Sequence, residues 1–149
     1  MRSVVQRVTE ASVTIDGLQV ANIDKGLLVL VGIKADDTEK DMEYIINKVL
    51  GLRIFEDDAD KMNLSIRDIK GEVLIGPNFT LYGDATKGMR PSFMASGSPG
   101  VAQVKYDRFI QKLSQQDVPF QTGQFQADMK VRLLNDGPVT ILLDSSKII

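Results

Sequence analysis

The sequence LLVLVGI, residues 27–33, is a continuous apolar run that follows a turn at Lys25-Gly26. Such a run is typical of a strand that is buried on both faces, so residues 27–33 are predicted to form the central strand of a sheet. Before it, residues 2–9 and 12–15 are rich in Val and Thr. The Asp16-Gly17 pair between two short apolar segments is a strong hairpin signal. The opening of the chain is therefore predicted to be antiparallel.

Two helices are predicted from apolar spacing. Residues 42–50 carry apolar side chains at the spacing of one helical face, with capping candidates at 36–38 and Gly51 just past the end. A second helix is predicted to begin at Ser98-Pro99, because proline suits the first turn, and to run to about Gln116. This helix is predicted to present Tyr106, Phe109, Ile110 and Leu113 on one face.

Short apolar segments indicate further strands, at residues 72–75, 79–82, 129–134 and 139–143. Asn135-Asp136-Gly137-Pro138 is predicted to be a turn between the last two. The stretch from Gly83 to Gly100 is rich in Gly, Ser and Pro but contains apolar residues, so it is interpreted as a functional loop rather than a linker. Strands outnumber helices, and the fold class is predicted to be α+β in a single domain, residues 1–149.

The composition excludes several kinds of chemistry. The chain has 149 residues, 43% of them hydrophobic, and contains neither Cys nor His. Disulfides, thiol nucleophiles, the usual zinc sites and the Ser-His-Asp triad are therefore ruled out. An enzyme of this composition would depend on carboxylates, Lys, Tyr, hydroxyls, backbone amides or groups of its own substrate.

The charge limits the extent of any nucleic-acid contact. Eighteen Lys and Arg face twenty Asp and Glu, which gives a net charge of −2, so no basic field covers the whole chain. The half up to Ile75 is net −4 and the remainder net +2, so an anionic ligand is expected on the C-terminal half. No window resembles a signal peptide or a membrane span, and a cytoplasmic protein is expected.

The acidic run at residues 56–60 does not have the spacing of an EF-hand, because a loop begun at Asp58 would need Gly at Asn63 and Glu at Ile69. It is interpreted as a solvated loop, and no metal site is expected.

Three other segments each allow two interpretations. The backbone N–H groups around Asn78 and Phe79 could bind an oxyanion, with Thr80 the first hydroxyl of the next segment, or Thr80 is a plain strand residue. Residues 87–93, which include Lys87 and Arg90, suit a phosphate and a stacked base, or form a solvated loop pinned by Phe93. Residues 135–140 form a plain turn, or a cis Gly137-Pro138 peptide that presents two carbonyl acceptors.

In order along the chain, several segments resemble the D-aminoacyl-tRNA deacylase family. They are QRVTEASVTIDG (6–17), KGLLVLVGI (25–33), RIF (53–55) with KMNLS from 61, FTL (79–81), GMRPSF (88–93), TGQFQADM (122–129) and NDGPVT (135–140). Any one of these segments alone would be a weak signal. Together they cover nearly the entire chain in register, which makes the resemblance specific.

The resemblance implies a homodimeric hydrolase that cleaves the ester between a D-amino acid, or glycine, and the 3′ end of tRNA while sparing L-aminoacyl esters. It implies mainly antiparallel sheets that form a barrel-like core with two main flanking helices, and no cofactor. Gly137-Pro138 matches the cis pair that one subunit inserts into the pocket of the other as a chiral filter. Phe79 and Thr80 match the pocket floor, with Asn78 beside them, and Arg7 and Met129 match positions near the filter.

Because an aminoacyl ester is already activated and the neighbouring ribose 2′-OH can assist, this chemistry does not need histidine. A footprint on the terminal nucleotides needs only a few cations, for which Lys87 and Arg90 are candidates.

One position departs from the family pattern, since Pro77-Asn78 stands where Ser-Gln is usual. A sister branch that acts on misacylated L-alanyl-tRNA or glycyl-tRNA also has proline ahead of this motif, whereas Phe79 and NDGPVT favour the D-specific branch. A non-catalytic module that binds RNA 3′ ends is the remaining alternative.

Overall fold

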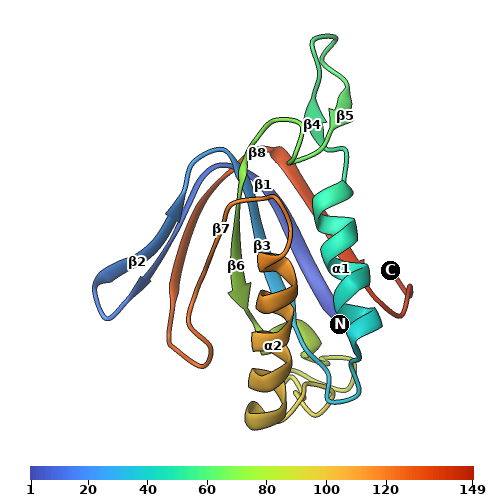
Figure 1. Ribbon diagram of the computed structural model, residues 1–149. Coiled ribbons are helices and arrows are strands. Elements are labelled where there is room, and N and C mark those ends of the chain that lie inside the picture. The colour runs from blue at the N-terminus through green and yellow to red at the C-terminus, as the bar shows by residue number, and fades with distance from the viewer.

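A six-stranded mixed sheet forms the body of the protein in the computed structural model, which describes all residues 1–149 (Figure 1). Its strands are β1 (Arg2–Ile15), β2 (Leu18–Ile23), β3 (Gly26–Gly32), β6 (Glu72–Pro77), β7 (Phe120–Thr122) and β8 (Lys130–Asp144). They follow the order β2-β1-β3-β6-β7, and β8 pairs with β1. β3 therefore lies between β1 and β6, which confirms the predicted central strand.

The sheet is antiparallel in its first part and parallel in its second. β1 pairs antiparallel with β2, β3 and β8, whereas β3–β6 and β6–β7 are parallel because a helix lies in each connection. The curved sheet nearly closes into a barrel. Its free edges are joined by the side-chain amide of Gln121, which accepts from Asn22 N at 2.9 Å and donates to Asn22 O at 2.6 Å.

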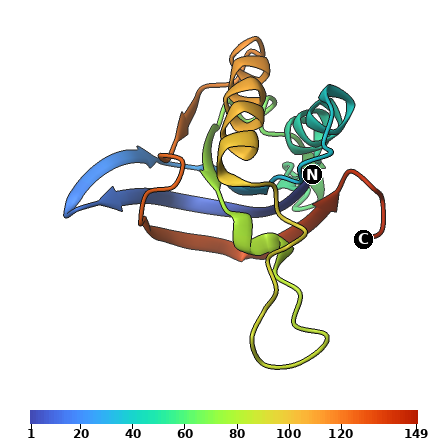
Figure 2. The same cartoon turned by 90° about the horizontal axis from the view of Figure 1, so that it is seen from below.

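Both predicted helices are confirmed, and both cover the same face of the sheet (Figure 2). α1 (Glu39–Gly51) begins with a capping box formed by Thr38 and Asp41. α2 (Pro99–Ser114) begins with proline, as expected from its fixed φ. Neither is long and apolar enough to cross a membrane.

The alternating faces of β3 contribute to two separate cores. Leu27, Val29 and Val31 pack in the larger cluster, which contains the apolar faces of α1 and α2. Leu28 points the other way, into a smaller cluster with side chains of β1 and β2. This explains why residues 27–33 show no polar alternation.

Two predicted segments differ from the structure. Residues 79–82 form a 3-10 helix, η1 (Phe79–Tyr82), because the Asn78 side chain accepts from Thr80 N at 3.1 Å and turns the chain after β6. The predicted turn at 135–138 does not separate two strands, because both flanking segments pair with β1 and belong to the single strand β8.

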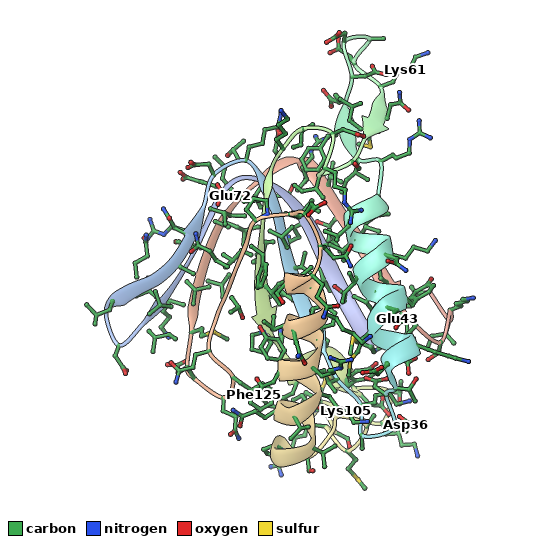
Figure 3. All side chains as sticks on the ribbon, in the orientation of Figure 1. Asp36, Glu43, Lys61, Glu72, Lys105 and Phe125 are labelled. Atoms are coloured by element: carbon green, nitrogen blue, oxygen red, sulfur yellow. The ribbon has the colours of Figure 1, made fainter.

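Two short strands, β4 (Phe55–Glu56) and β5 (Met62–Leu64), form a small hairpin that was not predicted, and β7 was not predicted either. The acidic run at residues 56–60 lies at the turn of the β4–β5 hairpin. There Asp57 Oδ1 accepts hydrogen bonds from Ala59 N at 2.8 Å and from Lys61 N at 3.1 Å. Lys61 lies at the end of this hairpin, away from the sheet (Figure 3). The Asp57 carboxylate therefore stabilises the turn in which the acidic run lies.

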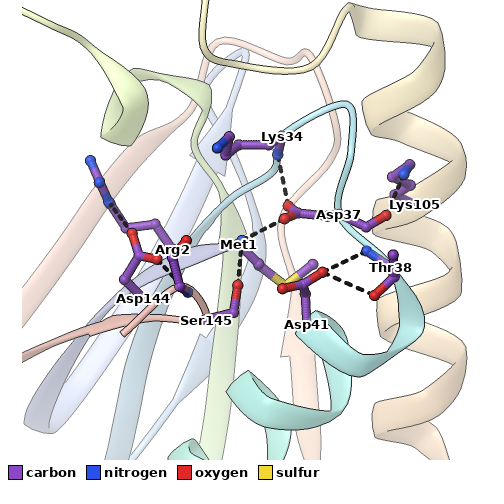
Figure 4. A network of polar contacts seen from close by, with 10 residues as sticks. Met1, Arg2, Lys34, Asp37, Thr38, Asp41, Lys105, Asp144 and Ser145 are labelled. Atoms are coloured by element: carbon purple, nitrogen blue, oxygen red, sulfur yellow. Dashed lines mark hydrogen bonds and ion pairs between the residues drawn. The ribbon is translucent and has the colours of Figure 1, made fainter. Parts of the chain in front are cut away.

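A buried polar network joins the start of β1 to both helices and to the end of β8 (Figure 4). The Met1 ammonium lies 2.6 Å from Asp37 Oδ1 and 2.7 Å from Ser145 Oγ. The other Asp37 oxygen accepts from Lys34 N at 2.7 Å, and Lys105 of α2 donates to the Asp37 carbonyl. These contacts fix the end of the sheet beside which η1 lies.

We predict that Gly26→Ala weakens the fold, because a Cβ at Gly26 would overlap the Glu72 carbonyl oxygen across the β3–β6 ladder. The expected loss is about 3 kcal/mol of unfolding free energy, measured by urea denaturation. Gly51→Ala is the matched control, because nothing lies within 4 Å of its Cβ position and alanine favours a helix. Equal stability of Gly26→Ala and the wild type would contradict the register of this ladder.

Candidate active site

The principal pocket of the protein, about 770 Å³, lies where β6 ends. One wall is the turn from Pro77 to Thr80, and a second is the start of α2 at Ser98 and Pro99. The third wall is the segment after β7, which contributes Phe125 and Met129. The pocket therefore gathers segments that are far apart in the sequence, and its lining is half hydrophobic.

The turn at the pocket floor leaves one backbone donor free. Asn78 N donates to Val31 O at 2.8 Å, and Thr80 N donates to Asn78 Oδ1 at 3.1 Å. Neither of these bonds uses the N–H of Phe79. The sequence predicted that backbone N–H groups around Asn78 and Phe79 could bind an oxyanion. Of these groups, the N–H of Phe79 is the candidate that the turn leaves available.

The Thr80 hydroxyl is exposed, and it donates to Asn78 Oδ1. An amide oxygen does not act as a general base at neutral pH, and no other partner of this hydroxyl is present. The geometry therefore provides no activation of Thr80 as a nucleophile. It gives Thr80 a part in holding the 3-10 turn.

The loop from Gly83 to Ala95 leaves the pocket with Lys87 and Arg90 exposed in it. Phe93 returns to the pocket and contacts Phe79 edge to face, with ring centroids 5.2 Å apart. The two ends of the loop are joined by hydrogen bonds between Asp84 and Ser92. Hydrogen bonds from the Thr86 hydroxyl and backbone hold the pKa of Asp84 below its ordinary value.

The wall formed by residues 123–129 was largely missed by sequence analysis. Gly123 is in close contact with Met129, because a Cβ at Gly123 would lie 2.5 Å from the Met129 sulfur. Phe125 lies beside Tyr106 of α2, with ring centroids 5.8 Å apart. The TGQFQADM motif marked this segment, but its aromatic residue gave no signal of its own. No cluster of carboxylates that could hold a metal ion is present.

The Gly137-Pro138 peptide is cis and lies in a four-residue bulge, where residues 136–139 of β8 stand opposite Arg7 alone on β1. Gly137, with φ of 140°, and Pro138 are both exposed. Val139 N donates to Asn135 Oδ1 at 2.7 Å, which closes the base of the bulge.

Buried Arg7 anchors this bulge to the body of the protein. Its Nε donates to Asp136 O and its Nη1 to Ile54 O, each at 2.8 Å. The guanidinium also faces the carboxylates of Glu56 and Asp136 at 3.7 and 3.9 Å. Arg7 thus connects the bulge to the β4–β5 hairpin.

Seven of the nine predicted site residues fall into two separate groups, and the other two, Lys87 and Arg90, lie exposed on the loop from Gly83 to Ala95. Asn78, Phe79, Thr80 and Met129 meet at the pocket, whereas Arg7, Gly137 and Pro138 lie together elsewhere. Arg7 pairs with Leu27 of β3, and the pocket begins at Leu30 and Val31. Leu27 and Leu30 are three residues apart, about 10 Å along the strand. Neither Arg7 nor residues 136–139 line the pocket, so the bulge of one chain lies outside its own pocket.

The fold is a small mixed barrel-like sheet, and its pocket combines apolar side chains with the backbone turn at Pro77–Thr80. A sequence profile described as D-Tyr-tRNA(Tyr) deacylase matches residues 4–144. The chain belongs to this family.

Two curated relatives named D-aminoacyl-tRNA deacylase illustrate the similarity. The protein of Thermotoga petrophila is 54% identical and that of Clostridium botulinum 55%, each over 99% of both chains. A solved structure named c-Myc DNA Unwinding Element Binding Protein has a TM-score of 0.92 at 41% identity, covering 97% of this chain and 98% of the other. A probable eukaryotic D-amino acid tRNA deacylase shares the fold, with a TM-score of 0.79 at 18% identity, over 96% and 98% of the chains.

Replacement of Arg7 by lysine should destabilise the protein by about 2 kcal/mol, because one ammonium cannot serve both carbonyls that the guanidinium bridges. Arg53→Lys is the comparison, since Arg53 also donates to a carbonyl, Asn63 O at 2.9 Å, but is exposed. Its effect should stay within about 0.5 kcal/mol. Chemical denaturation measures both, and equal effects would show that Arg7 does not anchor the bulge.

Proposed function

We propose that this protein hydrolyses the ester between a D-amino acid, or glycine, and the 3′ end of tRNA. The observation that carries this proposal is the match, over 99% of both chains, to relatives named D-aminoacyl-tRNA deacylase. Water attacks the carbonyl carbon of the ester, the bond to the ribose 3′ oxygen breaks, and the free amino acid and the tRNA 3′-OH are the products. We assign the reaction to the cytoplasm, where aminoacyl-tRNA is used.

The free N–H of Phe79 supports a mechanism based on backbone groups. In this mechanism it donates to the carbonyl oxygen as negative charge develops there, which lowers the barrier without a charged side chain. The substrate's ribose 2′-OH organises the attacking water, and the apolar wall with Met129 holds the acyl group. Asn78 and Thr80 then act by fixing the turn that presents Phe79 N–H.

We further propose that two copies complete each site, with Gly137-Pro138 of one copy in the pocket of the other. The separation of bulge and pocket within one chain supports this arrangement, because a filter could only come from a second copy. Exposed apolar side chains on η1 and β8 also favour a dimer. They are Phe79 (58% exposed), Leu134 (57%) and Leu142 (52%).

Selectivity would then come from exclusion. The carbonyl groups of Gly137 and Pro138 would occupy the space that the Cβ of an L-residue needs, while glycine and D-residues place no atom there. Such a filter rejects one hand without recognising any side chain, which allows a broad range of D-amino acids.

Lys87 and Arg90 are proposed to contact phosphates near the 3′ end of the tRNA. Both are exposed on the loop that returns to the pocket at Phe93. Two cations suit a short footprint on a chain whose net charge is −2.

The alternative activity is that of the sister branch, which removes L-alanine or glycine. Pro77 favours it, because proline lacks the N–H that another residue would offer at the pocket floor. A module that binds RNA 3′ ends without catalysis is the other alternative.

The proposal is tested by incubating the pure protein with matched D- and L-tyrosyl-tRNA and with L-alanyl-tRNA, in the presence of a metal chelator. We expect release of D-tyrosine with L-tyrosyl-tRNA spared. Selective release of L-alanine would establish the sister activity instead. Binding of every tRNA without ester cleavage would establish the non-catalytic module.

Thr80→Ala should lower the single-turnover deacylation rate by no more than about tenfold, because water and not the threonine attacks the ester. A second variant, Thr80→Ser, keeps the hydroxyl and its bond to Asn78 and should match the wild type. Loss of several orders of magnitude in Thr80→Ala, with a covalent acyl-enzyme in the wild type, would identify Thr80 as the nucleophile.

Pro138→Ala should loosen the exclusion of L-substrates, because alanine lacks the ring that fixes the backbone angle φ at this position and so holds the two carbonyl groups in place. The expected result is a rise of about tenfold or more in L-tyrosyl-tRNA cleavage with D-tyrosyl-tRNA cleavage little changed. Pro119→Ala serves as a control outside the bulge and the pocket. If Pro138→Ala still left L-tyrosyl-tRNA uncleaved, as the wild type is expected to do, Gly137-Pro138 would not be the filter.

A further inference from the structure

The wall of the pocket formed by residues 123–129 has few backbone bonds to hold it. Gly123 N donates to Ile75 O at 2.8 Å, which attaches its first residue to β6. Within the rest of the segment, the backbone makes one hydrogen bond of its own, from Ala127 N to Gln124 O at 3.3 Å. The placement of Phe125 and Met129 over the pocket therefore depends on side-chain contacts.

A buried tyrosine of α2 supplies one of these contacts. Tyr106 is 3% exposed, and its hydroxyl is hydrogen-bonded to Thr122 Oγ1. Thr122 Oγ1 in turn donates to Gly123 O at 2.9 Å. Because the single hydroxyl proton of Thr122 is used in that bond, Tyr106 must be the donor to Thr122.

The Tyr106 hydroxyl remains protonated across the neutral range. Burial raises its pKa to about 12, although the hydrogen bond with Thr122 acts in the opposite direction. The other residues on the same helix face are apolar, so Thr122 Oγ1 is the acceptor for the hydroxyl proton of Tyr106. They are Ala102, Phe109 and Leu113.

The ring of Tyr106 supports the same segment through a second contact. It packs against Phe125 with ring centroids 5.8 Å apart and an interplanar angle of 34°. Phe125 lies beside α2 (Figure 3) and lines the pocket. Two parts of one side chain, the hydroxyl and the ring, thus act on residues 122–125.

We propose that Tyr106 is a positioning residue, whose hydrogen-bonded chain through Thr122 to Gly123 holds residues 123–129 against the substrate. It does not contact the reacting ester, and the lining of the pocket includes Phe125 and Met129 but not Tyr106. The inference rests on the proposed deacylase function for the identity of the substrate. It accounts for a buried hydroxyl in an otherwise apolar helix face, where a phenylalanine would fill the same space.

Tyr106→Phe removes the hydroxyl and retains the ring, so it isolates the hydrogen-bonded chain. For D-tyrosyl-tRNA, KM should rise about tenfold, as expected for the loss of one buried hydrogen bond, while kcat changes less than twofold. Thr122→Val should show the same separation of KM from kcat, and Thr122→Ser, which keeps a hydroxyl, should restore the wild-type KM. Tyr44→Phe is the control, since the same oxygen is removed from a half-buried tyrosine of α1 outside the pocket.

Hydrogen exchange provides a measurement that does not depend on activity. In Tyr106→Phe, the backbone amides of residues 123–129 should exchange several-fold faster than in the wild type. In Tyr44→Phe, their exchange rates should equal those of the wild type. An unchanged KM and unchanged exchange would overturn the proposal even if the melting temperature fell, because only a packing role would remain. A fall in kcat at constant KM would also overturn it. A wild type without deacylase activity would defeat the proposed function and leave the exchange measurement to test Tyr106.

Discussion

The ladder between β1 and β8 is the constraint on which the arrangement depends. β8 pairs with β1 on both sides of a bulge, from Arg2–Asp144 at one end to Thr14–Lys130 at the other. Because the register resumes after the bulge, residues 136–139 must leave the sheet opposite Arg7. The buried guanidinium then bonds the carbonyl of Asp136. The position of the bulge along β1 also sets its distance from the pocket, which lies towards the other end of β3.

The chain contains neither His nor Cys, and the proposed mechanism requires neither. The pocket floor offers the amide of Phe79, because Asn78 and Thr80 are occupied in shaping the 3-10 turn. An ester that is already activated needs polarisation and alignment more than acid–base chemistry.

Much of the fold could be predicted from the sequence because its signals are local. The helix spacing at residues 42–50, the Asp16-Gly17 hairpin and the apolar run at 27–33 all correspond to elements of the structure. The 3-10 turn was missed because it depends on one hydrogen bond, which the Asn78 side chain accepts from Thr80 N. Such a bond produces no pattern of apolar residues in the sequence. The continuity of β8 was missed because a turn sequence such as Asn135–Pro138 does not reveal that both flanks share the partner β1.

The site was predictable only in part for similar reasons. The motifs that resemble the deacylase family contained Phe79, Met129 and Gly137-Pro138, but their division into two distant groups is a property of the sheet register. Phe125 and Tyr106 meet across a loop and a helix that are separate in the sequence. No local pattern indicates such a contact.

The proposed composite site can be tested by cross-linking, because the chain has no cysteine of its own to react. A chain carrying both Thr80→Cys and Asp136→Cys would be treated with a short bis-maleimide, with the two single variants as controls. If the bulge of one copy lies in the pocket of the other, the double variant should form a covalent dimer. Either single variant should form little covalent dimer. A double variant that stays monomeric on a denaturing gel, while still cleaving D-tyrosyl-tRNA and sparing the L-form, would contradict the account.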